Sequence, residues 1–242
     1  MPIRQQSSPF RLHFPIQLHW HRTTQLPHYA SGLWRLRADL QDGLSRAELD
    51  QYQALFWRYW QNLSHQLIPE ASAVLSTTSD AQVHELFAYL EEKNQQYYED
   101  YVDVPADEMR SKRLKRVQKS LERWLGELHP AQEQILTVWS QRLQPNHHEH
   151  LRFRQQWQTD FRRVLTQRYD LTRFTPAFSE LVLSPERNQS PTYRQVFAYN
   201  AALVKQMILD IAQLMTAPQR THLSKEPASL AENFEQLAKA SL

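Results

Sequence analysis

The chain has 242 residues, and its 28 Lys and Arg against 26 Asp and Glu leave a net charge of +2. Three glycines and no cysteine argue against phosphate-binding glycine loops and exclude disulfides, thiolate zinc sites and a cysteine nucleophile. So balanced a charge indicates no class of partner. Most residues favour helix, and the apolar ones recur three and four apart. We therefore expect an all-α protein, an elongated multi-helix bundle of about eight or nine amphipathic helices with no sheet.

The first predicted helix runs from about residue 17 to 42. Gly43 is placed to end it in a left-handed conformation, and Pro27 should kink it or mark its true start. Residues 1–17 show no helical pattern in the sequence, so we expect them to be disordered or irregular, with one helical domain over 18–242.

Capping boxes mark the next two helix starts, at Ser45 with Glu48 and at Ser79 with Gln82. We expect Pro69 to end or bend the earlier of these helices. Its predicted buried face consists of Leu49, Tyr52, Leu55, Phe56, Tyr59, Leu63 and Leu67.

Prolines and glycines set most of the remaining boundaries. A helix over 105–125 should end at Gly126, and helices should begin at Pro130, Pro176 and Pro191. The stretch 144–150 is a candidate hinge.

The last two predicted helices differ in character. The one after Ser190 is the most hydrophobic and should be centrally packed. A final capping box at Thr216 and Gln219 should open a short turn that breaks at Pro227.

A histidine cluster is the main candidate for metal binding. His147, His148 and His150 beside Glu149 offer two imidazoles at helical spacing to zinc or nickel. That is half of a site, so we favour a polar helix start and expect no metal and no cofactor. A Glu-x-x-His pair, which would suit a di-iron centre, does not occur.

The basic run on the predicted helix 105–125 is the strongest charge feature. It could bind phosphates or a lipid head-group surface. The preceding helix carries Glu91, Glu92, Glu99 and Asp100, and an antiparallel pairing of the two would neutralise the run, which is the interpretation we favour. The run comprises Arg110, Lys112, Arg113, Lys115, Arg116 and Lys119.

Aromatic side chains form a second candidate surface. The chain has 7 Trp and 10 Tyr, most of which should be core. Trp57 follows Phe56 and Trp60 follows Tyr59 in the sequence. Two adjacent aromatic side chains cannot both point toward the central seam of the helix, so one of each pair must point away from it. The residues we select for partner binding are Trp57, Trp60, Arg110, Lys112, Arg113, Lys115 and Arg116.

Several strings, taken in order, resemble an uncharacterised family of predicted lipoproteins of Gram-negative bacteria, domain of unknown function 6279. The strings are His19-Trp20-His21-Arg22, then Gln25-Leu26-Pro27 with Tyr29, Ser79-Asp80-Ala81-Gln82-Val83 with Leu86-Phe87, Arg123-Trp124-Leu125-Gly126 with Leu128 and Gln132, and Ser190-Pro191 with Tyr193 and Asn200. The resemblance implies a membrane-anchored periplasmic lipoprotein and assigns no catalytic residue. The sequence given has neither a signal peptide nor a lipobox cysteine, and as written it would be cytoplasmic.

Our leading hypothesis is a non-enzymatic helical protein of the cell envelope without a transmembrane segment. It would bind a peptide, a protein or a lipid-like partner or membrane surface. The Ser/Thr-x-x-Gln openings are also similar to those of small periplasmic stress chaperones, so a chaperone-like role is one version. The alternatives are a cytosolic nucleic-acid-associated protein using the basic run 110–119 and a metal-dependent enzyme.

Overall fold

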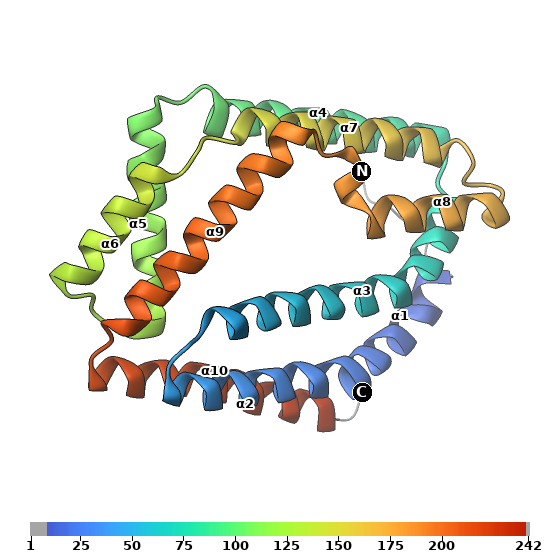
Figure 1. The fold of residues 1–242 in the computed structure, drawn as a ribbon. Coiled ribbons are helices and arrows are strands. Elements are labelled where there is room, and N and C mark those ends of the chain that lie inside the picture. The colour runs from blue at the N-terminus through green and yellow to red at the C-terminus, as the bar shows by residue number, and fades with distance from the viewer. Residues whose placement is uncertain (1–8, 241–242) are drawn as a thin grey trace.

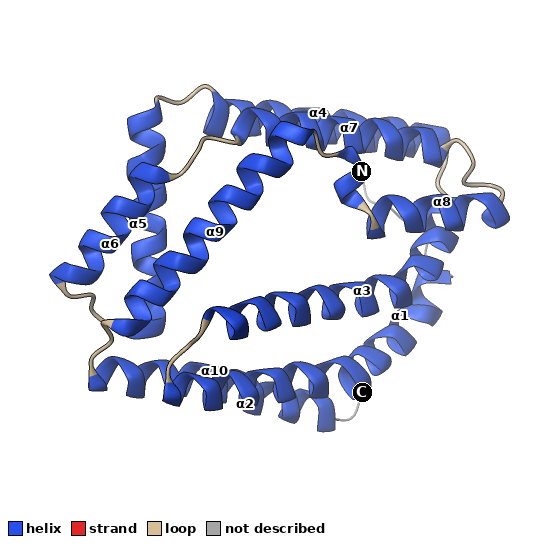
Figure 2. Ribbon diagram, in the orientation of Figure 1, coloured by secondary structure: helices blue, strands red, loops and turns tan. Residues whose placement is uncertain are grey.

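The computed structural model describes residues 9–240, with side chains from residue 15 onward except residue 42. Within that range every regular element is a helix and none is a strand, which confirms the all-α prediction (Figure 2). The α-helices are α1 (Pro9–Trp20), α2 (Leu26–Asp42), α3 (Arg46–Ser76), α4 (Asp80–Tyr97), α5 (Ala106–Leu125), α6 (Pro130–Arg142), α7 (His147–Leu165), α8 (Leu171–Leu183), α9 (Pro191–Gln213) and α10 (Ala217–Lys239). Two π-helical turns, η1 (His21–Gln25) and η2 (Tyr98–Val102), and a 3₁₀ turn, η3 (Pro185–Asn188), complete the set.

The helices are arranged as a four-sided frame (Figure 1). Helices α1 and α2 run along one side with α10 packed against α2, and α3 returns beside them. Helices α4 and α7 pair along the opposite side. Helices α5, α6 and α9 close one end, and at the other end α8 packs against both α7 and α3.

Two separate hydrophobic cores hold the frame. One joins α5, α6 and α9, and it includes Leu136, which is 1% exposed, and Ile211, which is 2% exposed. The other joins α4, α7 and α8 around Phe174, which has no exposed surface. Because these two cores lie in other sides of the frame, α3 has fewer neighbouring helices than an interior helix of a bundle would have.

The structure confirms most of the predicted helix starts. The side chain of Ser45 accepts from the backbone N–H of Glu48, and the carboxylate of Glu48 accepts in return from the backbone N–H of Ser45 at 2.7 Å. Ser79 and Thr216 open α4 and α10 with the same reciprocal pattern. Gly43 and Gly126 have positive φ at the ends of α2 and α5, as expected.

Pro176 and Pro227 were predicted to set helix boundaries and Pro69 to end or bend a helix, and all three lie inside helices. Helix α3 continues through Pro69, which is exposed, so water can hydrate the carbonyl group that loses its partner. Helix α8 begins before Pro176 because Asp170 caps it by accepting from the N–H of Thr172 at 3.1 Å. Helix α10 continues through Pro227, which is buried.

The N-terminal boundary also differs from the prediction. Helix α1 begins at Pro9, so the expectation of irregular backbone over 1–17 is wrong for Pro9–Gln17, while residues 1–8 lie outside the described part. Proline suits the first turn of a helix because its fixed φ is already helical. Pro27 follows the π-helical turn η1 as one of the first residues of α2, where its missing N–H is tolerated.

The candidate hinge over 144–150 contains the α6–α7 connection, which is fastened to α9. The backbone N–H of Gln144 donates to the Asn200 side chain at 3.0 Å, and the Asn200 amide donates back to the carbonyl of Gln144 at 2.8 Å. Helix α9 packs on α6 through one face and leaves Phe197 exposed, so it is less central than its hydrophobicity predicted.

Candidate functional site

The first half of α3 is poorly covered for so apolar a helix. No side chain over residues 46–63 is fully buried, whereas Ile68 is buried in the half that packs on α8. Phe56, Trp57 and Trp60 are 62%, 48% and 43% exposed. Large aromatic side chains gathered on one exposed helix are a feature of interaction sites.

Two apolar cavities lie between α3 and the α1–α2 side of the frame. Their volumes are about 560 and 540 Å³. Leu63 lines both cavities, so they adjoin at this residue, and we call the two together the α2–α3 groove. Each volume falls within the roughly 300–1,000 Å³ common among small-molecule sites.

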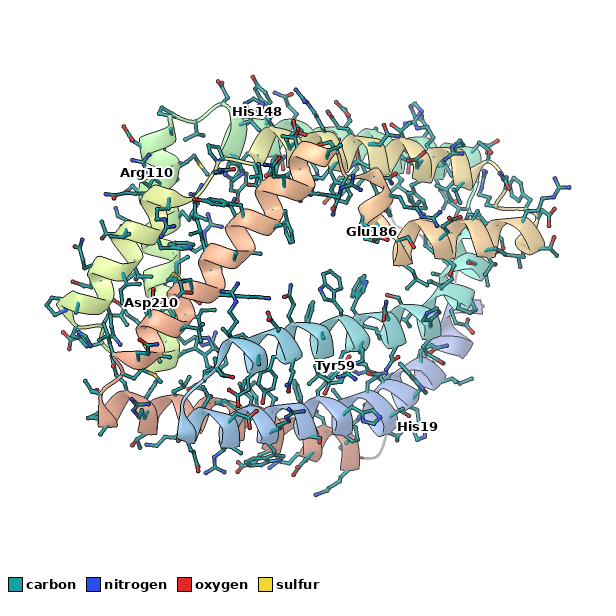
Figure 3. All side chains as sticks on the ribbon, viewed as in Figure 1. His19, Tyr59, Arg110, His148, Glu186 and Asp210 are labelled. Carbon is teal, nitrogen blue, oxygen red and sulfur yellow. The ribbon has the colours of Figure 1, made fainter. Side chains whose placement is uncertain are left out.

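The helices that flank the groove are joined by a hydrogen bond from Tyr59. Its hydroxyl donates to the carbonyl oxygen of His28 at 2.6 Å. The Tyr59 ring also packs edge-on against Tyr29, with ring centroids 4.8 Å apart. Figure 3 shows Tyr59 on the side of α3 that faces α2. This contact fixes the spacing of the two helices beside the cavities.

Gly32 allows the helices to come this close. A Cβ atom at this position would lie 2.7 Å from the hydroxyl oxygen of Tyr59 and 3.2 Å from a methyl carbon of Leu55. Gly32 is helical, so its role here is to provide space.

The cavity on the α1 side is lined mainly by apolar residues. Trp20 and Leu67 contribute to its wall, together with His21 and Glu70. Burial lowers the pKa of the His21 ring, which favours its neutral form. This part of the groove therefore suits hydrocarbon better than charge.

The cavity on the α2 side receives residues from three helices. Tyr29 comes from α2, Trp60 from α3, and Leu230 and Phe234 from α10. The rings of Tyr29 and Phe234 lie edge to face, with centroids 6.0 Å apart. Helix α10 thus completes a wall that α2 and α3 begin.

A third cavity, of about 420 Å³, continues the line and brings positive charge to it. It shares Tyr52 and Leu55 with the α2-side cavity, and Arg35 and Arg58 line it. Arg35 donates to the side chain of Gln51 at 2.6 Å. Arg58 makes no hydrogen bond or ion pair with another described residue. We call this place the arginine end of the groove.

Tyr52 sits at the junction between the apolar and the charged parts. Its hydroxyl donates to the carboxylate of Asp39 at 2.5 Å. Burial, followed by this hydrogen bond and the charge of Asp39, raises the pKa of Tyr52 well above its usual range. Arg35 lies 3.7 Å from the same carboxylate, so Asp39 is already engaged and Arg58 is the less committed cation.

The structure separates the two surfaces that the sequence suggested as one. Trp60 lines the groove, and Trp57 packs against Phe56 beside it, with ring centroids 5.8 Å apart. The basic run lies on α5, on a different side of the frame, where Arg110 is labelled (Figure 3). The aromatic and basic candidates therefore do not form a single site.

The expected neutralisation of the basic run by the preceding helix is wrong. Helix α4 packs on α7, while α5 packs on α6 and α10. Two cations instead pair within their own helix, Arg110 with Asp107 at 3.2 Å and Lys112 with Glu108 at 2.7 Å. Acidic residues in the first turn of α5 interact favourably with the positive end of the helix dipole, and they neutralise two cations of the basic run.

The histidine cluster lies at the start of α7 among aromatic rings. His147 Nδ1 is 3.1 Å from the Tyr97 hydroxyl, and His150 Nδ1 is 3.1 Å from that of Tyr193. His148 is exposed. Among the side chains that the structure describes, which begin at residue 15 and leave out residue 42, no group of three or more His, Cys, Asp and Glu is placed to hold a metal ion.

Sequence reasoning did not find several residues of the groove. Tyr29 and Leu36 fall within the first predicted helix, over about 17–42, but their contact with α3 and α10 depends on packing between distant segments. Arg35 and Arg58 lie outside the basic run 110–119, so no charge run drew attention to them. Gly32 offered a signal, since a glycine inside a helix often marks a close approach.

Of three comparisons with known proteins, one gave a match, and its family is the one that the sequence resembles. A search of curated proteins and a search of solved structures found no match. None of the helices in the described range is long and apolar enough to cross a membrane. The profile of one family matches residues 5–194, most of the chain. The chain therefore belongs to the family of unknown function DUF6279.

Proposed function

We propose that this protein binds an amphipathic lipid with one long apolar chain and an anionic head group. The chain would lie in the α2–α3 groove, and the head group would meet Arg35 and Arg58. Of the partners considered from the sequence, this selects the lipid-like one.

The adjacency of the three cavities, which share lining residues, carries the proposal. Leu63 joins the two apolar cavities, and Tyr52 and Leu55 join the second of these to the arginine end. An apolar channel that leads to two cations, one of them without a partner among the described residues, is complementary to a chain with a negative end.

The length of the groove also fits an acyl chain. Its wall on the α1–α2 side runs from Gln17 to Leu36, or roughly 28 Å at about 1.5 Å per residue. One leaflet of a bilayer is about half of a hydrocarbon core of roughly 30 Å. A single acyl chain therefore fits along the groove with room to spare.

A helical peptide is a poorer fit to this space. A helix with its side chains is about 10 Å across, so a 28 Å length would fill roughly 2,000 Å³. The apolar cavities, of about 560 and 540 Å³, hold about half of that. A bound helix would have to lie partly outside the groove.

The experiment is a binding titration of the full chain with palmitate, followed by displacement of an environment-sensitive fluorescent fatty acid. The test variant is Leu63→Trp, which places an indole where the two apolar cavities meet. The matched control is Leu171→Trp on α8, where the native leucine is 43% exposed and lines none of the three cavities.

We expect saturable binding by the native chain and the control, and at least about tenfold weaker binding by Leu63→Trp, a loss of about 1.4 kcal/mol. Absence of saturable palmitate binding would contradict the proposal. Equal binding by Leu63→Trp and the native chain, with both variants folded by circular dichroism, would place any bound lipid elsewhere.

The broader expectations of the sequence remain predictions. A place in the cell envelope accords with a lipid ligand, and we include it in the proposal together with a non-catalytic role. A chaperone-like activity would appear as suppressed aggregation of an unfolding client, and the palmitate-blocked protein should then lose it. The nucleic-acid alternative predicts salt-sensitive retention of RNA that depends on the run 110–119.

A further inference from the structure

The corner of the frame where α4, α5 and α7 meet carries positive charge for which the described residues provide no carboxylate partner. Arg113 on α5 is only partly exposed and makes no hydrogen bond or ion pair with another described residue. Arg116, one turn further along α5, likewise makes none. Their neighbours Arg110 and Lys112 do have acidic partners, on the same helix.

His147 brings a polar atom without a partner to the same corner. Its Nε2 is buried and has no hydrogen-bond partner within the described part of the chain. Its Nδ1 lies 3.1 Å from the hydroxyl of Tyr97. We assign the phenol as the donor in this bond, which leaves the proton of the neutral ring on Nε2. The result is a buried N–H donor that lacks an acceptor.

The His147 ring is held in place by aromatic neighbours. It stacks on Tyr101 with centroids 5.6 Å apart and an interplanar angle of 29°, and Tyr97 stacks on Tyr101 at 4.8 Å. The direction of the unpartnered N–H is therefore fixed by packing. A fixed donor needs an acceptor that comes to it, because the ring is not free to turn toward one.

Charged side chains act on the His147 ring in addition to its burial. Burial is the main cause that lowers the pKa of His147, and the charges of Arg113, His150 and Arg116 lower it further. Burial and the charges of Arg110 and Arg116 lower the pKa of Arg113. Cations gathered around a half-buried position repel one another, so the folded chain gains if a negative group enters.

We propose that this corner is a binding site for a phosphate group, held by Arg113, Arg116 and the Nε2–H of His147. Guanidinium groups bind the oxygens of phosphate through paired N–H donors, and the imidazole N–H supplies one further donor. A water molecule could satisfy His147 but would leave the two arginines unneutralised. The site is independent of the α2–α3 groove, and it gives part of the basic run a specific ligand.

The test is calorimetric titration of the full chain with inorganic phosphate at low ionic strength. The test variant is Arg113→Gln, and the control is Lys119→Gln, which removes one positive charge from an exposed position on the same helix. A second variant, His147→Phe, removes the Nε2–H, keeps an aromatic ring beside Tyr101 and leaves the charge of the neutral side chain unchanged. Circular dichroism checks that each variant keeps its helices.

We expect phosphate affinity to fall at least about tenfold in Arg113→Gln and less than about twofold in Lys119→Gln, because a fitted site loses a direct contact and the control loses only distant charge. His147→Phe should also weaken binding by several fold, because it removes the Nε2–H donor. No binding of phosphate by the native chain, or equal losses in Arg113→Gln and Lys119→Gln, would overturn the proposal.

A vesicle arm distinguishes the source of the phosphate. Sedimentation with phosphatidic acid vesicles is compared with sedimentation with phosphatidylcholine vesicles, for the native chain and for Arg113→Gln. Selective binding to phosphatidic acid that is lost in Arg113→Gln indicates a lipid head group. Calorimetric binding without vesicle binding indicates a free phosphate. Both results support the site.

Discussion

The Tyr59 hydroxyl donates a 2.6 Å hydrogen bond to the carbonyl oxygen of His28, and this bond joins α3 to the α1–α2 side of the frame. The bond forms beside Gly32, where a Cβ atom would stand 2.7 Å from the same hydroxyl. The first half of α3 is thus held against α2 at this one contact. On both sides of the contact, apolar side chains of α3 face the groove.

The substitution Gly32→Ala should weaken lipid binding more than it changes stability. Alanine gains about 1 kcal/mol of helix propensity over glycine, which offsets the loss of about 1 kcal/mol from the Tyr59 hydrogen bond. Displacement of the Tyr59 ring reshapes the groove. We expect the free energy of unfolding in urea to stay within about 1 kcal/mol of the native value and palmitate affinity to fall several fold. Ser31→Ala, at an exposed neighbouring position, is the control and should leave affinity unchanged.

Affinity should rise with the length of the acyl chain until the groove is filled. Each buried methylene contributes about 0.8 kcal/mol, or roughly fourfold in affinity. A series of saturated fatty acids from 8 carbons upward, measured by displacement, checks this; the chain lengths are experimental choices spanning about half to all of a bilayer leaflet. Affinity that is independent of chain length would mean that the hydrocarbon does not enter the groove.

Arg58→Gln should reduce affinity for palmitate and leave affinity for the uncharged hexadecanol nearly unchanged. Arg58 is exposed, and removal of one half of an ion pair at an exposed site weakens binding of the anion by up to about 1 kcal/mol, while the apolar walls stay intact. Arg187→Gln is a matched control outside the three cavities. Parallel losses for both ligands would contradict the assignment of the arginine end.

Alkaline stability should depend on Tyr52. Its pKa is raised in the folded chain by burial and by the hydrogen bond to Asp39. Because the unfolded chain releases this proton near pH 10 and the folded chain does not, stability is complete below that pH and is lost as pH rises above it. Tyr52→Phe should therefore lose less stability than the native chain between about pH 9 and pH 11, measured by urea unfolding.

The buried pair of Gln132 and Gln219 should be essential to the α6–α10 junction. Each amide donates to the other, at 3.1 and 2.9 Å, and Gln219 also donates to the carbonyl of Glu127 at 2.8 Å. Gln219→Leu leaves Gln132 buried without this partner, so we expect a loss of about 2 to 4 kcal/mol in unfolding free energy. A change similar to that of the exposed substitution Gln53→Leu would contradict this account.

Local signals in the sequence predicted helix starts well where contacts between residues close in the sequence determine the boundary. The Ser45 and Ser79 capping boxes satisfy N–H groups at helix starts, which requires only residues three apart. Pro227 was predicted to break the helix, which is its effect in an isolated helix, whereas here α10 packs against α2, α5 and η1. Tertiary packing outweighed the local preference.

The candidate site was less predictable because it is made by distant segments. Trp60 was identified from adjoining aromatics, and it lines the groove. The meeting of Tyr29, Tyr59 and Phe234 requires the path of the whole chain. The arrangement of the whole frame also determines that α4 packs on α7. Sequence spacing alone therefore could not show whether the acidic residues of α4 face the basic helix α5.

The most direct measurement of the central claim is an amide NMR spectrum of the full chain with a nitroxide-labelled stearate. If the acyl chain lies in the α2–α3 groove, the nitroxide should broaden the signals of Gly32 and Leu63, and unlabelled palmitate should restore them. The signal of Leu136, buried in the α6 core, should stay sharp. Uniform broadening over the surface, or broadening near Leu136 with Gly32 and Leu63 unaffected, would contradict the account.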